Sequence, residues 1–160
     1  MSRAMHTHRF LYLILATTLL CLTGRGAFAQ KCDAPEPDFK IVPPGASVAP
    51  DSAGFSGVWA GTWLLPAWQL GNRTSQCAVI HISVEDSDRA AVAYCYGTRS
   101  DLQNAPQCDL YQAVIRGPYL IFFTSDGTNI SLRLKGPGTA QVQADFPHNV
   151  PTIVTNFQKL

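Results

Sequence analysis

Hydrophobic and small polar residues alternate along residues 55–63, where aromatic rings and glycines share one parity. A period of two is typical of a β-strand with one buried face. Short runs of similar character recur to the end of the chain, separated by turn-forming residues. Together they predict eight strands and no helix. The seven strands that follow the first are Cys77–Val84, Arg89–Tyr96, Leu110–Arg116, Tyr119–Thr124, Asn129–Lys135, Thr139–Ala144 and Thr152–Phe157.

The predicted fold is therefore all-β, an eight-stranded antiparallel meander closed as a small barrel. Consecutive short strands with tight turns are typical of this architecture. A β-sandwich is the alternative, because the same series of hairpins can fold into two packed sheets. Eight strands make a barrel whose interior is just filled by side chains, or which holds one small ligand.

The hairpin around residues 125–128 (Ser-Asp-Gly-Thr) gives the most specific prediction of strand pairing. Asp-Gly is a strong hairpin signal, and we expect Thr124 to face Asn129 across the turn. In that register one face of the hairpin is entirely hydrophobic and is expected to face the core. Its members are Tyr119, Ile121, Phe123, Ile130, Leu132 and Leu134.

The beginning of the chain has the pattern of a secretory signal peptide. Arg3 and Arg9 precede the apolar run Phe10–Leu22, and small residues flank Phe28 where a signal peptidase reads. The run has 13 residues, short of the roughly 20 needed to cross a bilayer, and we expect no membrane span elsewhere. We therefore expect residues 1–29 to be cleaved and the protein to reach the bacterial periplasm or the exterior.

The remaining 131 residues have the size of one domain. Residues 30–53 are rich in proline, which forbids a helix and weakens a sheet ladder, so an extended N-terminal tether is predicted. Residues 54–160 form the predicted β-barrel domain.

Charge argues against two classes of partner. Three of the twelve Lys and Arg residues lie in the leader, which leaves nine basic side chains against eleven acidic ones. A mature chain with a charge of about −2 and no basic patch is poorly suited to nucleic acid or to an anionic membrane surface.

Four cysteines remain after the leader, which predicts two disulfides in an exported protein. Cys95 ends one predicted strand and Cys108 precedes the next, so we favour a Cys95–Cys108 bond, with Cys32–Cys77 holding the tether. The alternative joins Cys77 to Cys95 across a hairpin and leaves Cys32 with Cys108. No Cys-x-x-Cys pair or clustered ligand set is present, so we expect no metal site.

Gly57-Val58-Trp59, followed by Gly61-Thr62-Trp63, opens the first predicted strand. This stretch resembles the Gly-x-Trp signature of the calycins, which include the lipocalins, avidins and fatty-acid-binding proteins. The resemblance implies a barrel with a pocket for a small apolar ligand, with Trp59 closing one end. The chain lacks the Arg that lipocalins place over this Trp from near the end of the last strand.

A second resemblance concerns residues 119–132, the strand, polar turn and strand YLIFFTSDGTNISL. This segment is similar to one in the periplasmic inhibitors of C-type lysozyme. The resemblance implies a protein-binding module that acts as an enzyme inhibitor.

No acid–base pair or nucleophile motif stands out, so we expect a non-enzymatic protein without a cofactor. Several aromatic residues exceed what the expected core face needs, and clusters of exposed aromatic residues mark binding surfaces. The preferred function is the binding of a small apolar ligand, and the alternative is the binding of an extracytoplasmic protein. The candidate ligand-binding residues are Trp63, Trp68, Tyr94, Tyr96 and Phe122.

Overall fold

The computed structural model describes residues 32–66, 73–99, 104–148 and 150–160. The chain divides into two units, 1–31 and Cys32–Leu160, and the description concerns the second. The predicted leader and Trp68 lie outside the described residues. Within the part of the chain that is described, no helix has the length and apolar character of a membrane span.

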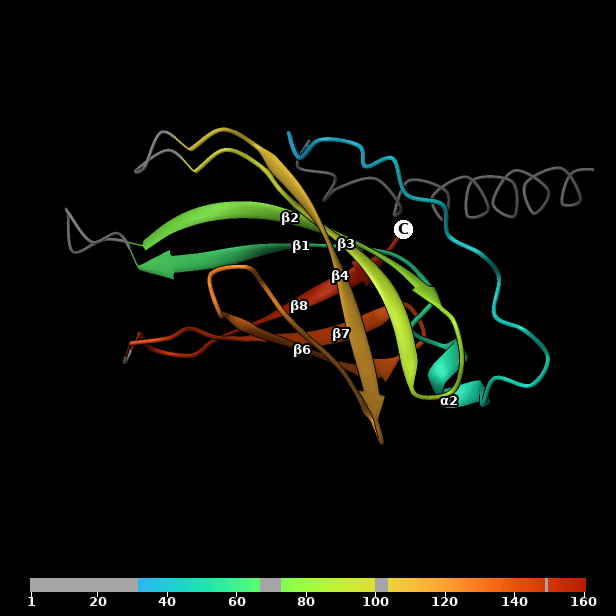
Figure 1. The fold of residues 1–160 in the computed structure, drawn as a ribbon. Coiled ribbons are helices and arrows are strands. Elements are labelled where there is room, and N and C mark those ends of the chain that lie inside the picture. Colours follow the sequence, from blue (N-terminus) through green and yellow to red (C-terminus); the bar gives the residue numbers. More distant parts are fainter. Residues whose placement is uncertain (1–31, 67–72, 100–103, 149) are drawn as a thin grey trace, which may run out of the picture. The chain divides into compact units, whose positions relative to one another are not determined.

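Eight antiparallel strands form a closed barrel, in which each strand pairs with its sequence neighbours and the last pairs with the first (Figure 1). The predicted meander barrel is confirmed, and the sandwich alternative is wrong because the sheet closes on itself. The strands are β1 (Gly57–Pro66), β2 (Arg73–Val84), β3 (Arg89–Tyr96), β4 (Gln107–Arg116), β5 (Tyr119–Phe123), β6 (Asn129–Gly136), β7 (Thr139–Asp145) and β8 (Ile153–Lys159).

Alternate residues of the strands fill the barrel. In β1 the buried row contains Trp59, Trp63 and Leu65, on the parity predicted from the sequence. Gly61 lies in the same row, where a Cβ would come within 2.1 Å of the Phe157 ring of β8. Glycine here allows that ring to pack directly against the β1 backbone. The rest of the core is mainly aliphatic and includes Ile80, Ile82, Val92, Leu120, Ile130, Leu132 and Val142.

The turn between β5 and β6 differs from the predicted one. The Thr124 N–H donates to the Thr128 carbonyl at 2.9 Å, and the Gly127 N–H donates to the Thr124 carbonyl at 2.9 Å. The loop therefore contains three residues, with Gly127 in the left-handed region at φ 84°. This is the hairpin in which a tight turn is followed by a glycine bulge, and it pairs Thr124 with Thr128 instead of Asn129.

The change in the turn shifts the strand register by one residue, which exchanges the two faces of β5. Leu120 pairs with Leu132 and Phe122 pairs with Ile130, and all four side chains are buried. The prediction was right for Ile130 and Leu132 of β6, and Leu134 is partly buried against the core, but it was wrong for β5. The β5 residues wrongly assigned to the core are Tyr119, Ile121 and Phe123.

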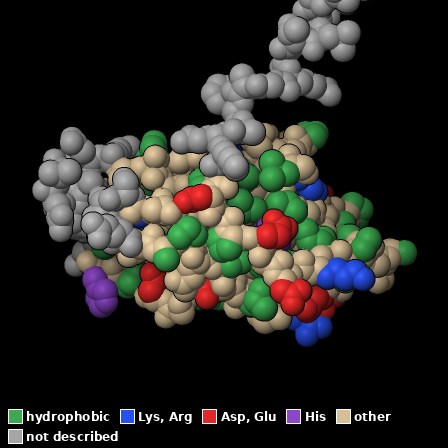
Figure 2. Space-filling model, turned by 90° about the horizontal axis from the view of Figure 1, so that it is seen from above, with side chains coloured by type: hydrophobic (Ala, Val, Ile, Leu, Met, Phe, Trp, Pro, Cys, Tyr) green, Lys and Arg blue, Asp and Glu red, His purple; other side chains and the backbone are tan. Residues whose placement is uncertain are grey.

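Residues 32–49 form an extended arm against the outside of the barrel (Figure 1). The Val42 N–H donates to the Ser83 hydroxyl of β2 at 3.1 Å. Phe39 covers His81 edge-on, with ring centroids 6.5 Å apart. The predicted tether is thus extended, but it is held along β2. Figure 2 looks onto this side of the barrel and shows acidic side chains spread among hydrophobic and polar ones.

Two disulfides fasten the arm and one hairpin. Cys32 of the arm bonds to Cys77 of β2. Cys95 and Cys108 lie directly opposite each other in the β3–β4 ladder and are also bonded. These are the pairs favoured from the sequence, and the β2–β3 register opposes the alternative because it places Cys95 opposite Val79. Such bonds are typical of oxidising compartments outside the cytoplasm.

The arm leads into a four-residue helix, α2 (Pro50–Ala53), at one end of the barrel, the closed end. The prediction that the prolines exclude a helix is wrong here, because a proline at the first helical position loses no needed N–H. Phe55 and Trp59 fill this end, and the Trp59 Nε1–H donates to the Phe55 carbonyl at 2.8 Å. Lys159 lies over the Trp59 ring, 5.3 Å from its centroid.

Candidate functional site

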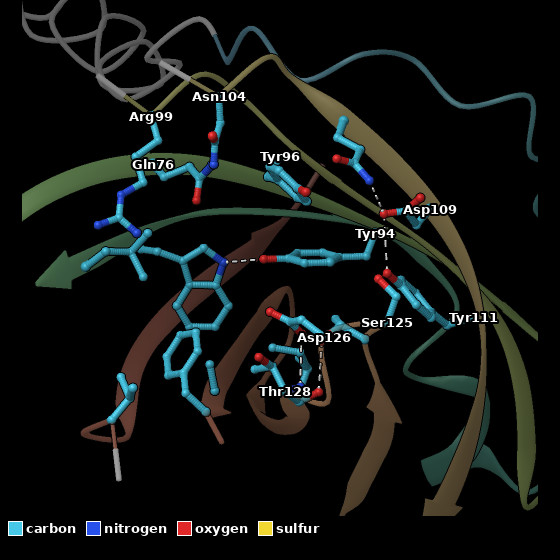
Figure 3. A pocket seen from close by; sticks show the side chains of 18 of the residues that line it. Gln76, Tyr94, Tyr96, Arg99, Asn104, Asp109, Tyr111, Ser125, Asp126 and Thr128 are labelled. Carbon is cyan, nitrogen blue, oxygen red and sulfur yellow. Dashed lines mark hydrogen bonds between the residues drawn. The ribbon is translucent and has the colours of Figure 1, made fainter. Parts of the chain in front are cut away.

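A cavity of about 500 Å³ occupies the opposite end of the barrel, the open end (Figure 3). Trp63, Tyr94 and Ile130 give it an apolar floor, supplied by β1, β3 and β6. Its volume falls in the range of small-molecule sites, which combine apolar walls with a few polar groups. The polar groups around its rim are those of Gln76, Arg99, Asn104, Gln107, Asp109, Ser125, Asp126 and Thr128.

Ring contacts and one hydrogen bond join the aromatic residues of the floor. The Trp63 Nε1–H donates to the Tyr94 hydroxyl at 2.8 Å, and the Trp63 ring lies 5.5 Å from that of Phe157. Phe122 supports Tyr94 from the core, with ring centroids 5.9 Å apart. Burial raises the pKa of Tyr94 above its ordinary value, so its phenol keeps its proton. The floor is therefore an apolar surface whose polar atoms satisfy each other.

The short pairing between β4 and β5 creates the polar side of the rim. β4 has ten residues, but only Val114–Arg116 pair with β5. The first half of β4 pairs with β3 but has no β5 partner on its other side, and there it faces the 124–128 loop across the cavity. Alternate residues of that half, Gln107, Asp109 and Tyr111, line the wall. A strand that extends past its partner thus builds one side of the site.

Two carboxylates stand on this side. Asp109 accepts hydrogen bonds from the Gln107 side-chain amide at 2.8 Å and from the Tyr111 hydroxyl at 3.4 Å. Asp126 accepts from the Thr128 N–H at 3.0 Å and from the Thr124 hydroxyl. Burial acts to raise the pKa of Asp126, but these hydrogen bonds outweigh it and hold the pKa below its usual value. Asp126 is therefore a carboxylate at neutral pH.

Residues on the other side of the rim are anchored to loop carbonyls. The Gln76 side-chain amide donates to the Gly97 carbonyl at 2.9 Å. Arg99 donates through Nη2 to the Pro66 carbonyl at 2.8 Å, and it bridges to Asn104 through the backbone. Figure 3 shows Arg99, Gln76 and Asn104 together, away from Ser125 and Asp126. The rim thus has a basic side and an acidic side.

The structure distributes the predicted binding residues unevenly. Trp63, Tyr94 and Tyr96 line the cavity. Phe122 lies in the core beneath it, in contact with the Tyr94 and Tyr111 rings, and Trp68 lies outside the described residues. The cavity therefore brings three of the five together.

Sequence reasoning missed the polar rim, although one signal was present. In the stretch Gln107-Cys-Asp109-Leu-Tyr111, every second residue is polar or amphipathic. These residues lie on the same face of the strand as Ala113 and Ile115, which are buried further along it. Polar side chains at positions that face the interior indicate that this end of the barrel is open to water. The rim residues from loops, including Arg99 and Asp126, had no comparable signal, because periodicity does not place loop side chains.

Comparison with known proteins supports the fold alone. No protein-family model matches the chain, and no curated protein matches it. One similar solved structure is that of a fluorescence-activating β-barrel designed de novo. The match has a TM-score of 0.52 and 13% sequence identity, and it covers 71% of this chain and 100% of the designed one. The chain is thus similar in architecture to a designed β-barrel of unrelated sequence.

Proposed function

We propose that this protein is a non-enzymatic binding protein that holds a small apolar ligand in the cavity at its open end. The observation that carries the proposal is the contrast between the two ends of one barrel. Phe55 and Trp59 are buried at the closed end, where a smaller hollow of about 360 Å³ borders Trp59 and Lys159, whereas the open end holds a cavity of about 500 Å³ with an aromatic floor. A barrel that is packed at one end and has a cavity at the other is suited to bind a small ligand in that cavity.

Three further features support the proposal. The designed barrel of similar fold is fluorescence-activating, which is in keeping with a small-molecule role for this architecture. His81 faces outward beneath Phe39, away from the cavity, which supports binding without catalysis. The two disulfides support a working location outside the cytoplasm, with residues 1–29 as the leader.

The test is titration with a neutral probe, 1-naphthalenemethanol, followed by calorimetry. We expect saturable binding at one site per barrel. Tyr96→Ala removes a cavity wall, and loss of an aromatic contact of this kind weakens binding by about tenfold. Tyr119→Ala is the matched control, because Tyr119 lies on the outer face of β5, and it should leave the affinity unchanged.

Ala144→Phe provides an independent variant. Ala144 lines the cavity, and a ring at this position would occupy the space that the probe needs. The variant should abolish binding while circular dichroism shows an unchanged barrel. Folded wild-type protein that shows no saturable binding would overturn the proposal, as would binding that survives both cavity variants.

A second candidate function, a protein-binding module such as a lysozyme inhibitor, is favoured by one surface. Leu110 of β4 and Phe123 of β5 are 66% and 62% exposed on the outside of the barrel, and exposed apolar patches mark protein interfaces. If this candidate is right, the protein slows lysis of bacterial cell walls by a C-type lysozyme, and the double variant Leu110→Ser/Phe123→Ser loses the effect. Full lysozyme activity in the presence of excess wild-type protein would remove the inhibitor role.

A further inference from the structure

The acidic side of the rim has unused capacity for hydrogen-bond donors. Among the described residues, both hydrogen bonds to Asp109 end on Oδ2, and both hydrogen bonds to Asp126 end on Oδ1. A carboxylate accepts about four hydrogen bonds. The second oxygen of each group therefore has capacity for a donor from a ligand.

The two carboxylates act on the same part of the cavity. The pKa of Tyr96 is raised first by burial, and then by the negative charges of Asp109 and Asp126 and by Tyr111. Asp109 of β4 and Asp126 of the β5–β6 loop both line the cavity, and Figure 3 shows them on the side away from Arg99. That side is bordered by the Tyr96 and Tyr111 side chains (Figure 3). Aromatic faces attract cations, and more strongly where water is excluded.

A buried hydroxyl lies at the same place. Thr128 is 3% exposed and lines the cavity beside Asp126. Its Oγ1 makes no hydrogen bond of standard geometry with the described residues, although the hydroxyl lies close enough to Asp126 to help lower the pKa of that carboxyl. Buried polar groups are nearly always satisfied by protein, water or ligand. A donor bound between Asp126 and Thr128 would satisfy this hydroxyl oxygen.

The charges that line the cavity favour a cation. Two carboxylates, Asp109 and Asp126, are set against one guanidinium, that of Arg99, among the described lining residues. The acidic groups lie with Ser125 and Thr128, and Arg99 lies with Gln76 and Asn104 (Figure 3). A positive group placed on the acidic side would meet two opposite charges at the partly exposed rim, next to the apolar floor of the cavity.

We propose that the cavity selects an organic cation, in which a protonated amine or quaternary ammonium is carried on an aromatic or branched apolar body. The ammonium lies between Asp109, Asp126 and the Thr128 hydroxyl, against the faces of Tyr96 and Tyr111. The body lies on the floor formed by Trp63. This inference rests on the proposed function, because it names the class of ligand that the same cavity binds.

The experiment compares three probes that share one ring system and differ in charge: 1-naphthylmethylamine, 1-naphthalenemethanol and 1-naphthoate, at neutral pH. We expect the protonated amine to bind about tenfold or more tighter than the alcohol, the size of a charge-assisted hydrogen bond. The carboxylate should bind weakest. Addition of salt should narrow the gap between amine and alcohol, because Asp126 is exposed and Asp109 is only partly buried at the rim, where ions screen their charges.

Variants separate this inference from the proposed function. The double variant Asp109→Asn/Asp126→Asn keeps the hydrogen-bonding shape of the rim and removes its charge. The preference for the amine should then fall to within about twofold, while the affinity for the alcohol is unchanged. Asp51→Asn is the matched control, because Asp51 lies in α2 at the closed end, and it should leave the preference intact.

The possible outcomes distinguish failure of the inference from failure of the proposed function. Equal binding of amine and alcohol overturns the inference and leaves the proposed function standing. Tightest binding of naphthoate also overturns it, because Arg99 would then select the ligand. A preference for the amine that survives the double variant overturns the assignment to these carboxylates. Binding of none of the three probes to the folded protein overturns the inference and the proposed function together.

Discussion

The two ends of the barrel start from the same chemistry and reach different results. Trp59 and Trp63 lie four residues apart in the buried row of β1, and each indole N–H makes a hydrogen bond of 2.8 Å. Trp59 donates to the backbone carbonyl of Phe55, so the chain itself crosses the barrel above it. Trp63 donates to the side chain of Tyr94, and the space beyond this pair is the cavity.

The comparison shows that a buried Trp makes a plug or a floor according to what lies above it. At the closed end the cover is continuous chain, from the arm through α2 to Phe55. At the open end the described cover consists of separate side chains on β3, β4 and the β5–β6 loop. Four predictions test this difference, in order from the largest expected effect to the smallest.

Trp59→Ala should cause the largest loss of stability. It removes the plug of the closed end, and deletion of a fully buried ring costs about 3–5 kcal/mol of the free energy of unfolding because a cavity remains. Trp63→Ala should cost less, because Trp63 borders the larger hollow, about 500 Å³ against about 360 Å³ beside Trp59. Urea unfolding followed by circular dichroism measures both, and equal losses would contradict the distinction between plug and floor.

Gly61→Ala should destabilise the protein by overpacking the core between Trp59 and Trp63. The new Cβ would meet the buried Phe157 ring at 2.1 Å, and overpacking of a core costs about 1–3 kcal/mol. Gly136→Ala is the matched control, because a Cβ there meets no described atom within 4 Å. Thermal unfolding should separate the two variants by several degrees, and equal melting temperatures would show that Phe157 yields freely.

Tyr94→Phe should destabilise the open end mildly. The variant removes the acceptor of the Trp63 indole N–H, and an unsatisfied buried donor costs about 1–3 kcal/mol. Water in the adjoining cavity can replace the phenol, so we expect the lower limit, about 1 kcal/mol. Unfolding in urea measures the change, and a loss well above that limit would show that the floor is as dry as the closed end.

Alkaline pH should have the smallest effect on the stability of the protein. We expect this effect to arise from Tyr94 at the open end. Burial raises the pKa of Tyr94, so the folded protein keeps this proton at a pH where the unfolded chain, with an ordinary pKa near 10, has lost it. The stabilisation that the neutral Tyr94 phenol contributes is therefore fully present below about pH 10 and is lost as the pH rises above it. The fall in urea midpoint should be shallower in Tyr94→Phe. An identical fall in wild type and variant would contradict the assignment to Tyr94.

The sequence was sufficient for the antiparallel meander of eight strands, because strand periodicity and turn residues are local. Closure as a barrel was preferred over a sandwich but the choice stayed open, because it depends on pairing between β1 and β8, the first and last strands. The alternation that contains Trp59 and Trp63 identified β1 and its buried face. The β5 face was wrong because Asp126-Gly127 fits turns of two or three residues, and the choice reverses every side chain. The bonds that fix the choice, between Thr124 and Thr128, become visible only in three dimensions.

The candidate site was predictable only in its aromatic part. Tyr94 and Tyr96 belong to a strand, and their position at the cavity follows from strand parity and strand length. Asp126 and Arg99 come from loops, whose side-chain positions depend on the whole barrel. The position of Asp109 depends on β4 extending beyond its pairing with β5, which is a property of two strands together.

One measurement tests the contrast between the two ends directly, the indole N–H signals of the protein in a heteronuclear NMR spectrum during titration with 1-naphthalenemethanol. Single Trp→Phe variants at positions 59, 63 and 68 assign the three signals. We predict that the Trp63 signal shifts saturably while the Trp59 signal stays in place. A shift of Trp59 without Trp63, or no shift of either signal up to the solubility limit of the probe, would contradict the assignment of the open end as the binding site.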